Sequence, residues 1–210
     1  MKSIFVSLAV CALAVSQQAG AAAIFTETFN TSGDTAGWFQ VSDSPGTTLE
    51  QEPVSGVLNF SGTSASIFYV AADGSSSGGA FSGDYTAAGI TGIRFSLQLD
   101  AGSTMSQLVF ELTNLTADET WQYTLTLGAA GIANDYFVPI PGDGSGWTQT
   151  TGSESFGSLL SQVEEAGLAL NGSTNGPVSG HLDNVATVPE ASGALLALAG
   201  LAMAGLRRRR

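Results

Sequence analysis

The chain has 210 residues, with 18 acidic and six basic side chains and a net charge of −12. Five of the six cations lie near the two ends, so the stretch 24–187 has Arg94 beside 17 carboxylates and a net charge of −16. This charge repels phosphate backbones and anionic lipid headgroups, which excludes nucleic acid as a partner. Divalent cations and neutral glycans are compatible partners, although the same charge also serves solubility alone.

The N-terminal segment has the three parts of a secretory signal peptide. Lys2 supplies the basic start, 4–15 the apolar stretch, and Ala21 and Ala23 the small residues of a cleavage site. We expect signal peptidase to cleave after Ala23 and the protein to be exported. Cys11 is the only cysteine and leaves with the signal, so the mature protein has no disulfide.

The C-terminal segment 188–210 also has three parts in a defined order. A Val-Pro-Glu motif is followed by the apolar stretch 193–206 and then by a run of arginines. An apolar stretch followed at once by a basic cluster predicts a membrane stop with the basic end in the cytoplasm. The stretch is shorter than the roughly 20 residues of a stable spanning helix, and marginal anchors of this layout are often removed.

This layout resembles the PEP-CTERM sorting signal of Gram-negative bacteria, which a membrane protease-transpeptidase called exosortase processes. Ala191 stands where that family usually has proline. The resemblance implies transient insertion of the helix 193–206 into the inner membrane with a cytoplasmic C-terminus, then processing and a final place at the cell surface or outside it. The alternative is an ordinary C-terminal membrane anchor. The matching residues are Val188, Pro189, Glu190, Arg207, Arg208, Arg209 and Arg210.

The domain 24–187, between the signal peptide 1–23 and the sorting segment, is predicted to be all-β. Apolar residues alternate strictly over 93–100 and 121–127, which is the pattern of half-buried strands. One helix-like stretch covers 156–165. Many short strands with one short helix favour an antiparallel β-sandwich, jelly-roll-like. Further strands are expected at 57–60, 67–70 and 108–112.

The end of this domain carries a second resemblance. The stretch 156–170, a glycine-rich loop and the His-Leu-Asp-Asn-Val run at 181–185 are similar to the end of laminin IV-like domains. They are also similar to the end of other jelly-roll carbohydrate-binding modules, and 26–29 is compatible with the first strand of those modules. Likeness at the level of the fold does not establish a ligand, and exopolysaccharide is kept as a candidate partner.

Two carboxylates raise the question of a metal. In regular strands Glu27 and Asp183 would face the core, which costs several kcal/mol for an unpaired charge. Arg94 is expected on the opposite, polar face of its strand, and calcium accepts such oxygen ligands. The jelly-roll modules often hold a structural calcium between their first and last strands. That resemblance implies Glu27 and Asp183 as ligands, helped by Asp34 or Asn184; alternatively, Glu27 lies at a wet strand edge and Asp183 caps a turn.

Aromatic rings are the other candidate ligand contacts. The rings expected to contact glycan are those of Trp38, Tyr85, Tyr136 and Trp147, which lie near glycine-containing loops or strand starts. The tryptophans among them could equally be packed strand edges. Trp121 shares the parity of the apolar residues in its strand and is predicted to belong to the core.

Catalysis has little support in the sequence. The mature domain has neither cysteine nor lysine, and its one histidine, His181, is not accompanied by a Gly-x-Ser-x-Gly elbow. No catalytic residue is therefore assigned. We expect a non-catalytic structural or glycan-binding protein of the exopolysaccharide layer. The alternative is a secreted, carboxylate-dependent glycan-active enzyme, which would need two carboxylates facing one cleft.

Overall fold

The computed structural model describes residues 25–31, 33–41, 47–52 and 56–190. The signal peptide with Ala21 and Ala23, the apolar stretch 193–206 and the four terminal arginines lie outside these ranges. In the ranges described, no helix has the length and apolarity that crossing a bilayer requires.

Antiparallel strands dominate the fold, as the alternating sequence pattern predicts. Every strand pairing in the described residues is antiparallel. The elements in chain order are β1 (Thr26–Glu27), β2 (Phe39–Val41), β3 (Thr47–Glu52), β4 (Val57–Ala72), the 3-10 turn η1 (Ser76–Gly79), β5 (Ile90–Leu99), β6 (Met105–Asn114), β7 (Glu119–Leu125), β8 (Asn134–Pro139), β9 (Thr148–Thr151), α1 (Phe156–Leu160) and β10 (Glu165–Pro189).

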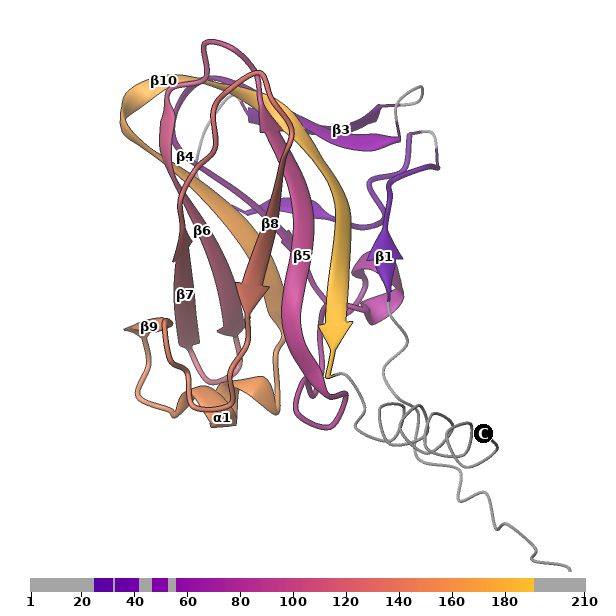
Figure 1. Cartoon of the computed structure of the whole chain (residues 1–210), viewed down its shortest axis with the longest axis vertical. Helices are drawn as coiled ribbons and strands as arrows, with labels where there is room; N and C mark the ends of the chain where they lie inside the picture. Colours follow the sequence, from indigo (N-terminus) through magenta and orange to yellow (C-terminus); the bar gives the residue numbers. More distant parts are fainter. Residues whose placement is uncertain (1–24, 32, 42–46, 53–55, 191–210) are drawn as a thin grey trace, which may run out of the picture.

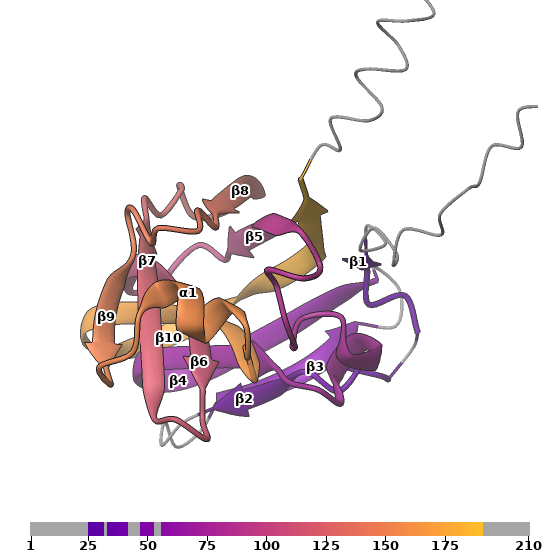
Figure 2. The same ribbon diagram turned by 90° about the horizontal axis from the view of Figure 1, so that it is seen from below.

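Two long strands, β4 and β10, run through both layers of a sandwich (Figure 1). The C-terminal half of β10 lies between β4 and β5, and with β3, β8 and β1 these strands form what we call the β5 layer. The N-terminal half of β10 lies between β4 and β6, and with β2, β7 and β9 they form the β6 layer. Figure 2 shows β5 and β8 on one side of the molecule and β2, β4 and β6 on the other.

The core lies between the two layers. Ile93, Phe95, Leu97 and Leu99 of β5 are all buried, which confirms the inward face predicted from their alternation. The ring of Phe95 stacks on that of Phe110 of β6, with ring centroids 6.3 Å apart. Burial of each such side chain stabilises the fold by about 1.5–3 kcal/mol. This apolar filling joins the layers without a disulfide.

The helix is shorter than its sequence pattern suggests. It begins after the N-cap Ser155, whose side chain accepts a hydrogen bond from the backbone N–H of Ser158. It ends at Leu160 instead of reaching 165, because Val163 exchanges backbone hydrogen bonds with Gly83 and β10 starts two residues later. The predicted strands 57–60 and 67–70 are parts of the single strand β4.

Both ends of the described chain lie at neighbouring strands (Figure 1). The backbone N–H of Thr187 donates to the carbonyl of Phe25 at 3.2 Å, and that of Glu190 donates to the carbonyl of Gly89 at 2.7 Å. Val188 and Pro189 therefore belong to β10, and the regular structure continues past the boundary expected after residue 187. The Val-Pro-Glu motif begins inside the folded sheet.

Candidate functional site

The outer face of the β5 layer carries a row of polar side chains. Residues 179, 181 and 183 of β10 point outward, because alternate residues of a strand share a face. In the sheet register, His181 lies between Asn59 of β4 and Gln98 of β5, and Asp183 lies beside Ser96. The strand pairing thus gathers amides, hydroxyls and carboxylates from distant parts of the chain on one surface.

Three hollows on this face share lining residues and form one groove, which we call the outer groove. The first, of about 560 Å³, is lined by Arg94, Asp135 and Phe137 among others. The second, of about 360 Å³, shares Ser96 and Asn184 with the first. The third, of about 260 Å³, shares His181 with the second and is lined also by Glu50 and Asp100. The outer groove therefore follows β10 over residues 179–186.

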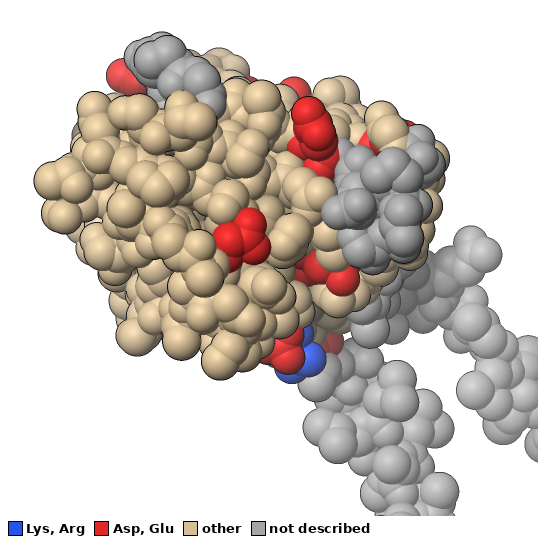
Figure 3. Space-filling view, turned by 90° about the horizontal axis from the view of Figure 1, so that it is seen from above, with Lys and Arg blue, Asp and Glu red and all other residues tan. Residues whose placement is uncertain are grey.

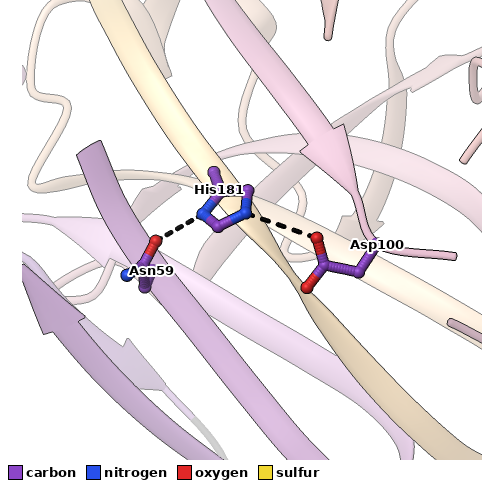
Figure 4. Close-up of polar contacts among 3 residues, drawn as sticks. All are labelled: Asn59, Asp100 and His181. Carbon is purple, nitrogen blue, oxygen red and sulfur yellow. Dashed lines mark hydrogen bonds and ion pairs between the residues drawn. The ribbon is translucent and has the colours of Figure 1, made fainter. Parts of the chain in front are cut away.

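His181 stands in the middle of the outer groove and is held from both sides (Figure 4). Its Nε2 lies 3.3 Å from Oδ1 of Asp100, which directly follows β5. Its Nδ1 contacts Oδ1 of Asn59 on β4. Two partners fix the plane of the imidazole ring, while about a third of the side chain stays exposed to a ligand.

An exposed aromatic ring marks the first hollow. Phe137 of β8 is 47% exposed, and the guanidinium carbon of Arg94 lies 5.7 Å from the centre of its ring. Asp135 lies two residues earlier on the same face and contacts the hydroxyl of Ser96. Sequence reasoning missed Phe137, although the aromatic and β-branched run 136–138 with Pro139 at its end would have indicated an edge strand.

The burial of three predicted glycan contacts requires a correction. Trp38, Tyr85 and Trp147 are 3%, 1% and 7% exposed and pack in the core, so none offers a ring face to a sugar. The segments that fold over these rings are remote in sequence, which is why local pattern did not reveal their burial. Their polar hydrogens are donated internally, from Trp38 to Ser77 Oγ (2.9 Å), from Tyr85 to the carbonyl of Phe81 (2.8 Å) and from Trp147 to the carbonyl of Pro139 (2.8 Å).

Tyr136 has an intermediate position. Its ring stacks on Phe95 with centroids 5.1 Å apart, and its hydroxyl accepts a hydrogen bond of 2.8 Å from the backbone N–H of Gly128. Part of the residue still lines the first hollow. Of the four predicted contacts, Tyr136 alone adjoins the outer groove. Trp121 packs partly buried against the core, in agreement with its predicted role.

Glu27 is stabilised by hydrogen bonds. Its Oε1 accepts the backbone N–H groups of Thr28 at 3.0 Å and Phe29 at 2.9 Å, and its Oε2 accepts the hydroxyl of Ser77 at 2.8 Å. These donors explain how the charge is tolerated beside the core. Asp34, one of the predicted helpers, accepts the backbone N–H of Ala36 within its own turn.

Asp183 faces outward, against the prediction that it shares a face with Val185. Asn184 between them has a φ of +52° and forms a bulge that reverses the alternation of β10. Both carboxylate oxygens of Asp183 accept hydrogen bonds from Asn184, from its backbone N–H at 2.7 Å and from Nδ2 at 2.8 Å. Burial raises the pKa of Asp183, the N–H of Asn184 opposes this rise, and repulsion from Glu27 adds to it.

Metal ligands are sparse in the part of the chain that the structure describes. No three or more histidine, cysteine, aspartate or glutamate side chains are arranged there to hold a metal ion. A calcium ion near Glu27 and Asp183 would take its other ligands from the Asn184 amide and from backbone oxygens. The mutual repulsion of the two carboxylates is the feature that such an ion would relieve.

A second group of carboxylates lies on the outer face of the β6 layer, outside the outer groove. Gln122 Nε2 donates to Glu111 Oε1 at 2.7 Å, and the phenol of Tyr69 donates to Glu165. Burial raises the pKa of both carboxyls, and the hydrogen bonds oppose this rise. Repulsion from Glu165 raises the pKa of Glu111 further, and repulsion from Asp73 raises the pKa of Glu165 further. Raised pKa values on one face are the feature that a carboxylate-dependent enzyme would need.

Comparison with known proteins places the fold. No family model and no curated protein sequence matches the chain. Among solved structures, an exo-beta-agarase is similar with a TM-score of 0.54 at 12% identity, covering 80% of this chain and 25% of its own. Another agarase has a TM-score of 0.53 at 13% identity, covering 77% and 26%. A carbohydrate-binding module of the β-sandwich superfamily has a TM-score of 0.50 at 11% identity, covering 74% and 58%.

These comparisons define the class of the protein as an antiparallel β-sandwich with the fold of carbohydrate-binding modules. At such identities the likeness shows the fold alone. The predicted resemblance to jelly-roll carbohydrate-binding modules is confirmed at that level. The chain spans about a quarter of the length of the two agarase chains.

Proposed function

We propose that the chain is an exported, non-catalytic glycan-binding protein of the cell surface or the extracellular polysaccharide layer. The observation that carries this proposal is the outer groove, a continuous row of polar side chains with an exposed aromatic ring at one end. The agarases and the carbohydrate-binding module of similar fold support a partner of the carbohydrate class.

The chemistry of the outer groove suits a hydroxyl-rich chain. A sugar hydroxyl both donates and accepts, and the groove offers Gln98 as a donor and Glu50, Asp100 and Asp183 as acceptors beside the partly exposed ring of His181. Ligand sites commonly combine an apolar or aromatic surface with a few polar groups that fix the orientation of the ligand, and the groove has both. The groove lies open on the surface, which suits the middle of a long polysaccharide.

The test is binding of the mature, exported protein to polysaccharides in gels for affinity electrophoresis. We expect a neutral polysaccharide to retard the protein and His181→Ala to reduce the retardation about tenfold, since His181 lies in two of the three hollows. Thr124→Ala, exposed on β7 of the other layer, is the matched control and should bind as wild type. Retardation by no polysaccharide would overturn the proposal.

Delivery by the C-terminal segment belongs to the same proposal. The apolar stretch 193–206 and the four arginines support transient insertion into the inner membrane and removal by an exosortase-type enzyme after signal peptidase has acted. Mass spectrometry of the mature C-terminus is the test, and we expect it to lack 193–210. Deletion of Arg207 to Arg210 should impair surface release, and normal release would contradict the sorting role.

A glycan-active enzyme is the second candidate, favoured by one observation. Glu111 and Glu165 have raised pKa values and lie on one face of the β6 layer, as acid and base groups of such enzymes can. Neither residue lines the outer groove. Release of reducing ends from a polysaccharide by wild type, abolished in Glu165→Gln, would establish the enzyme in place of the binding protein.

A further inference from the structure

Arg94 is the single lysine or arginine of the segment 24–187, and its donors are unused. In the described part of the chain its guanidinium forms no ion pair and no hydrogen bond, and it lies over the ring of Phe137. Figure 3 shows one blue patch beside red carboxylates on a largely tan surface. A guanidinium has five N–H donors in a planar fork, so all five remain free for a ligand in the first hollow.

An acceptor lies beside this donor. Phe137 is opposite Arg94 in the register of β5 and β8, and Asp135 is opposite Ser96 two positions along. Arg94 and Asp135 are therefore offset by two residues, or about 6.6 Å along the strands, and both line the first hollow. The ring of Phe137 lies over Gly92, on the side of Arg94 away from Asp135, and its exposed part offers an apolar surface to the C–H face of a sugar beside the guanidinium.

The charges around the first hollow disfavour an acidic sugar. Asp135 lines it, Asp183 lines the adjoining second hollow with Glu27 close enough to repel it, and the whole domain is strongly acidic. The single positive charge of Arg94 does not offset these three carboxylates. A vicinal diol, in contrast, can accept from Arg94 with one hydroxyl and donate to Asp135 with the other.

We propose that Arg94, Phe137 and Asp135 form the specificity-determining subsite of the outer groove and that it selects a neutral, diol-bearing sugar over an acidic one. The proposal rests on the glycan-binding function proposed above. It places recognition of the selected sugar at the end of the groove next to β1, while His181 contacts the polysaccharide further along the groove.

The test is calorimetric titration of the mature protein with four probes: cellohexaose, laminarihexaose, agarohexaose and an oligogalacturonate. We expect at least one neutral probe to bind, with a Kd that changes less than twofold between 50 and 500 mM NaCl. Phe137→Ala and Arg94→Gln should each weaken this binding at least tenfold, and Arg94→Lys should not restore it, because an ammonium lacks the fork. Leu115→Ala, an exposed apolar residue on the β6–β7 turn, is the matched control.

The outcomes separate the subsite from the general function. Wild-type affinity in Phe137→Ala and Arg94→Gln, together with lost affinity in His181→Ala, would overturn the subsite and leave glycan binding standing. Preferred binding of the oligogalacturonate, weakened by salt and by Arg94→Gln, would overturn the neutral class. Binding of no probe by wild type, and of no polysaccharide in the gels, would overturn both proposals. Arg94 and Phe137 are exposed, so unchanged circular dichroism and Tm should accompany the variants at these two positions.

Discussion

The phenol of Tyr69 on β4 donates a hydrogen bond of 2.9 Å to Oε1 of Glu165, the first residue of β10. Both side chains are buried on the outer face of the β6 layer, where Glu111 lies near them. Burial raises the pKa of Tyr69 well above its ordinary value, so the phenol keeps its proton and remains a donor. The arginine and the histidine of the domain lie in the outer groove on the other layer, where they cannot pair with Glu165. The phenol of Tyr69 therefore provides much of the stabilisation of this carboxyl.

Tyr69→Phe should destabilise the protein in a pH-dependent way. Burial raises the folded-state pKa of Glu165, so the folded protein favours the protonated carboxyl. The stability that this preference contributes is fully present below the unfolded pKa of about 4.3. It is lost as the pH rises through the folded-state pKa. Loss of the phenol donor should cost about 1–3 kcal/mol at a pH above the folded-state pKa of Glu165, where the carboxyl is charged. At pH 4 the cost should be smaller, because a neutral carboxyl needs the donor less.

Urea unfolding at both pH values measures this difference. Tyr136→Phe is the control, because its hydroxyl meets a backbone N–H and its loss should cost the same at both pH values. A cost of Tyr69→Phe that grows towards pH 4 would contradict the assignment.

Gly152→Ala should be one of the most damaging single substitutions on the surface. Gly152 has a φ of +90°, and an added Cβ would collide with Oε2 of the buried Glu119. That oxygen accepts the backbone N–H of Glu154 at 3.0 Å, so the collision would break a buried polar network. We expect a loss of about 2–3 kcal/mol in chemical denaturation.

Gly102→Ala separates backbone strain from collision. Gly102 has a φ of +101° but nothing within 4 Å of its added Cβ, so the substitution should cost only about 1 kcal/mol. Equal losses in the two variants would mean that contact with Glu119 contributes nothing.

Asn184 should be replaced more easily by glycine than by alanine. Its φ of +52° is unfavourable for a residue with a Cβ, and asparagine tolerates it better than alanine does. Asn184→Gly keeps the bulge and loses the side-chain hydrogen bond to Asp183, while Asn184→Ala adds strain of about 1 kcal/mol. Urea midpoints should rank glycine above alanine, and the reverse order would show that the bulge is not strained.

Calcium at Glu27 and Asp183 stays a prediction that thermal unfolding can check. An ion between the two carboxylates would remove their repulsion, so saturating calcium should raise Tm by about 5 °C and a chelator should reverse the rise. Asp183→Asn should abolish the response, while Asp84→Asn, which caps a separate turn, should keep it. An unchanged Tm would mean that the hydrogen bonds to Ser77 and Asn184 stabilise these carboxylates without a metal.

The strands were predictable wherever one face is buried and the other is wet. Ile93 to Leu99 alternate because successive side chains meet core and solvent in turn, and this pattern is legible in the residue order. The start of β10 is different. Residues 165–170 are buried on both faces, so no alternation is present, and the preceding Leu159, Leu160 and Val163 extend the helical spacing instead.

Residue order alone determined the acidic charge, the absence of cysteine from 24–187, the all-β class and the three-part layout of each end segment, because these depend on composition and local spacing. The tertiary structure decided which rings are buried and which face is grooved. Segments from far apart in the chain pack over Trp38 and Trp147 and bury them in the core, while Phe137 stays on the outside. The outer groove likewise joins residues from Thr26 to Ala186, and only the pairing of β10 with β1, β4 and β5 brings them side by side.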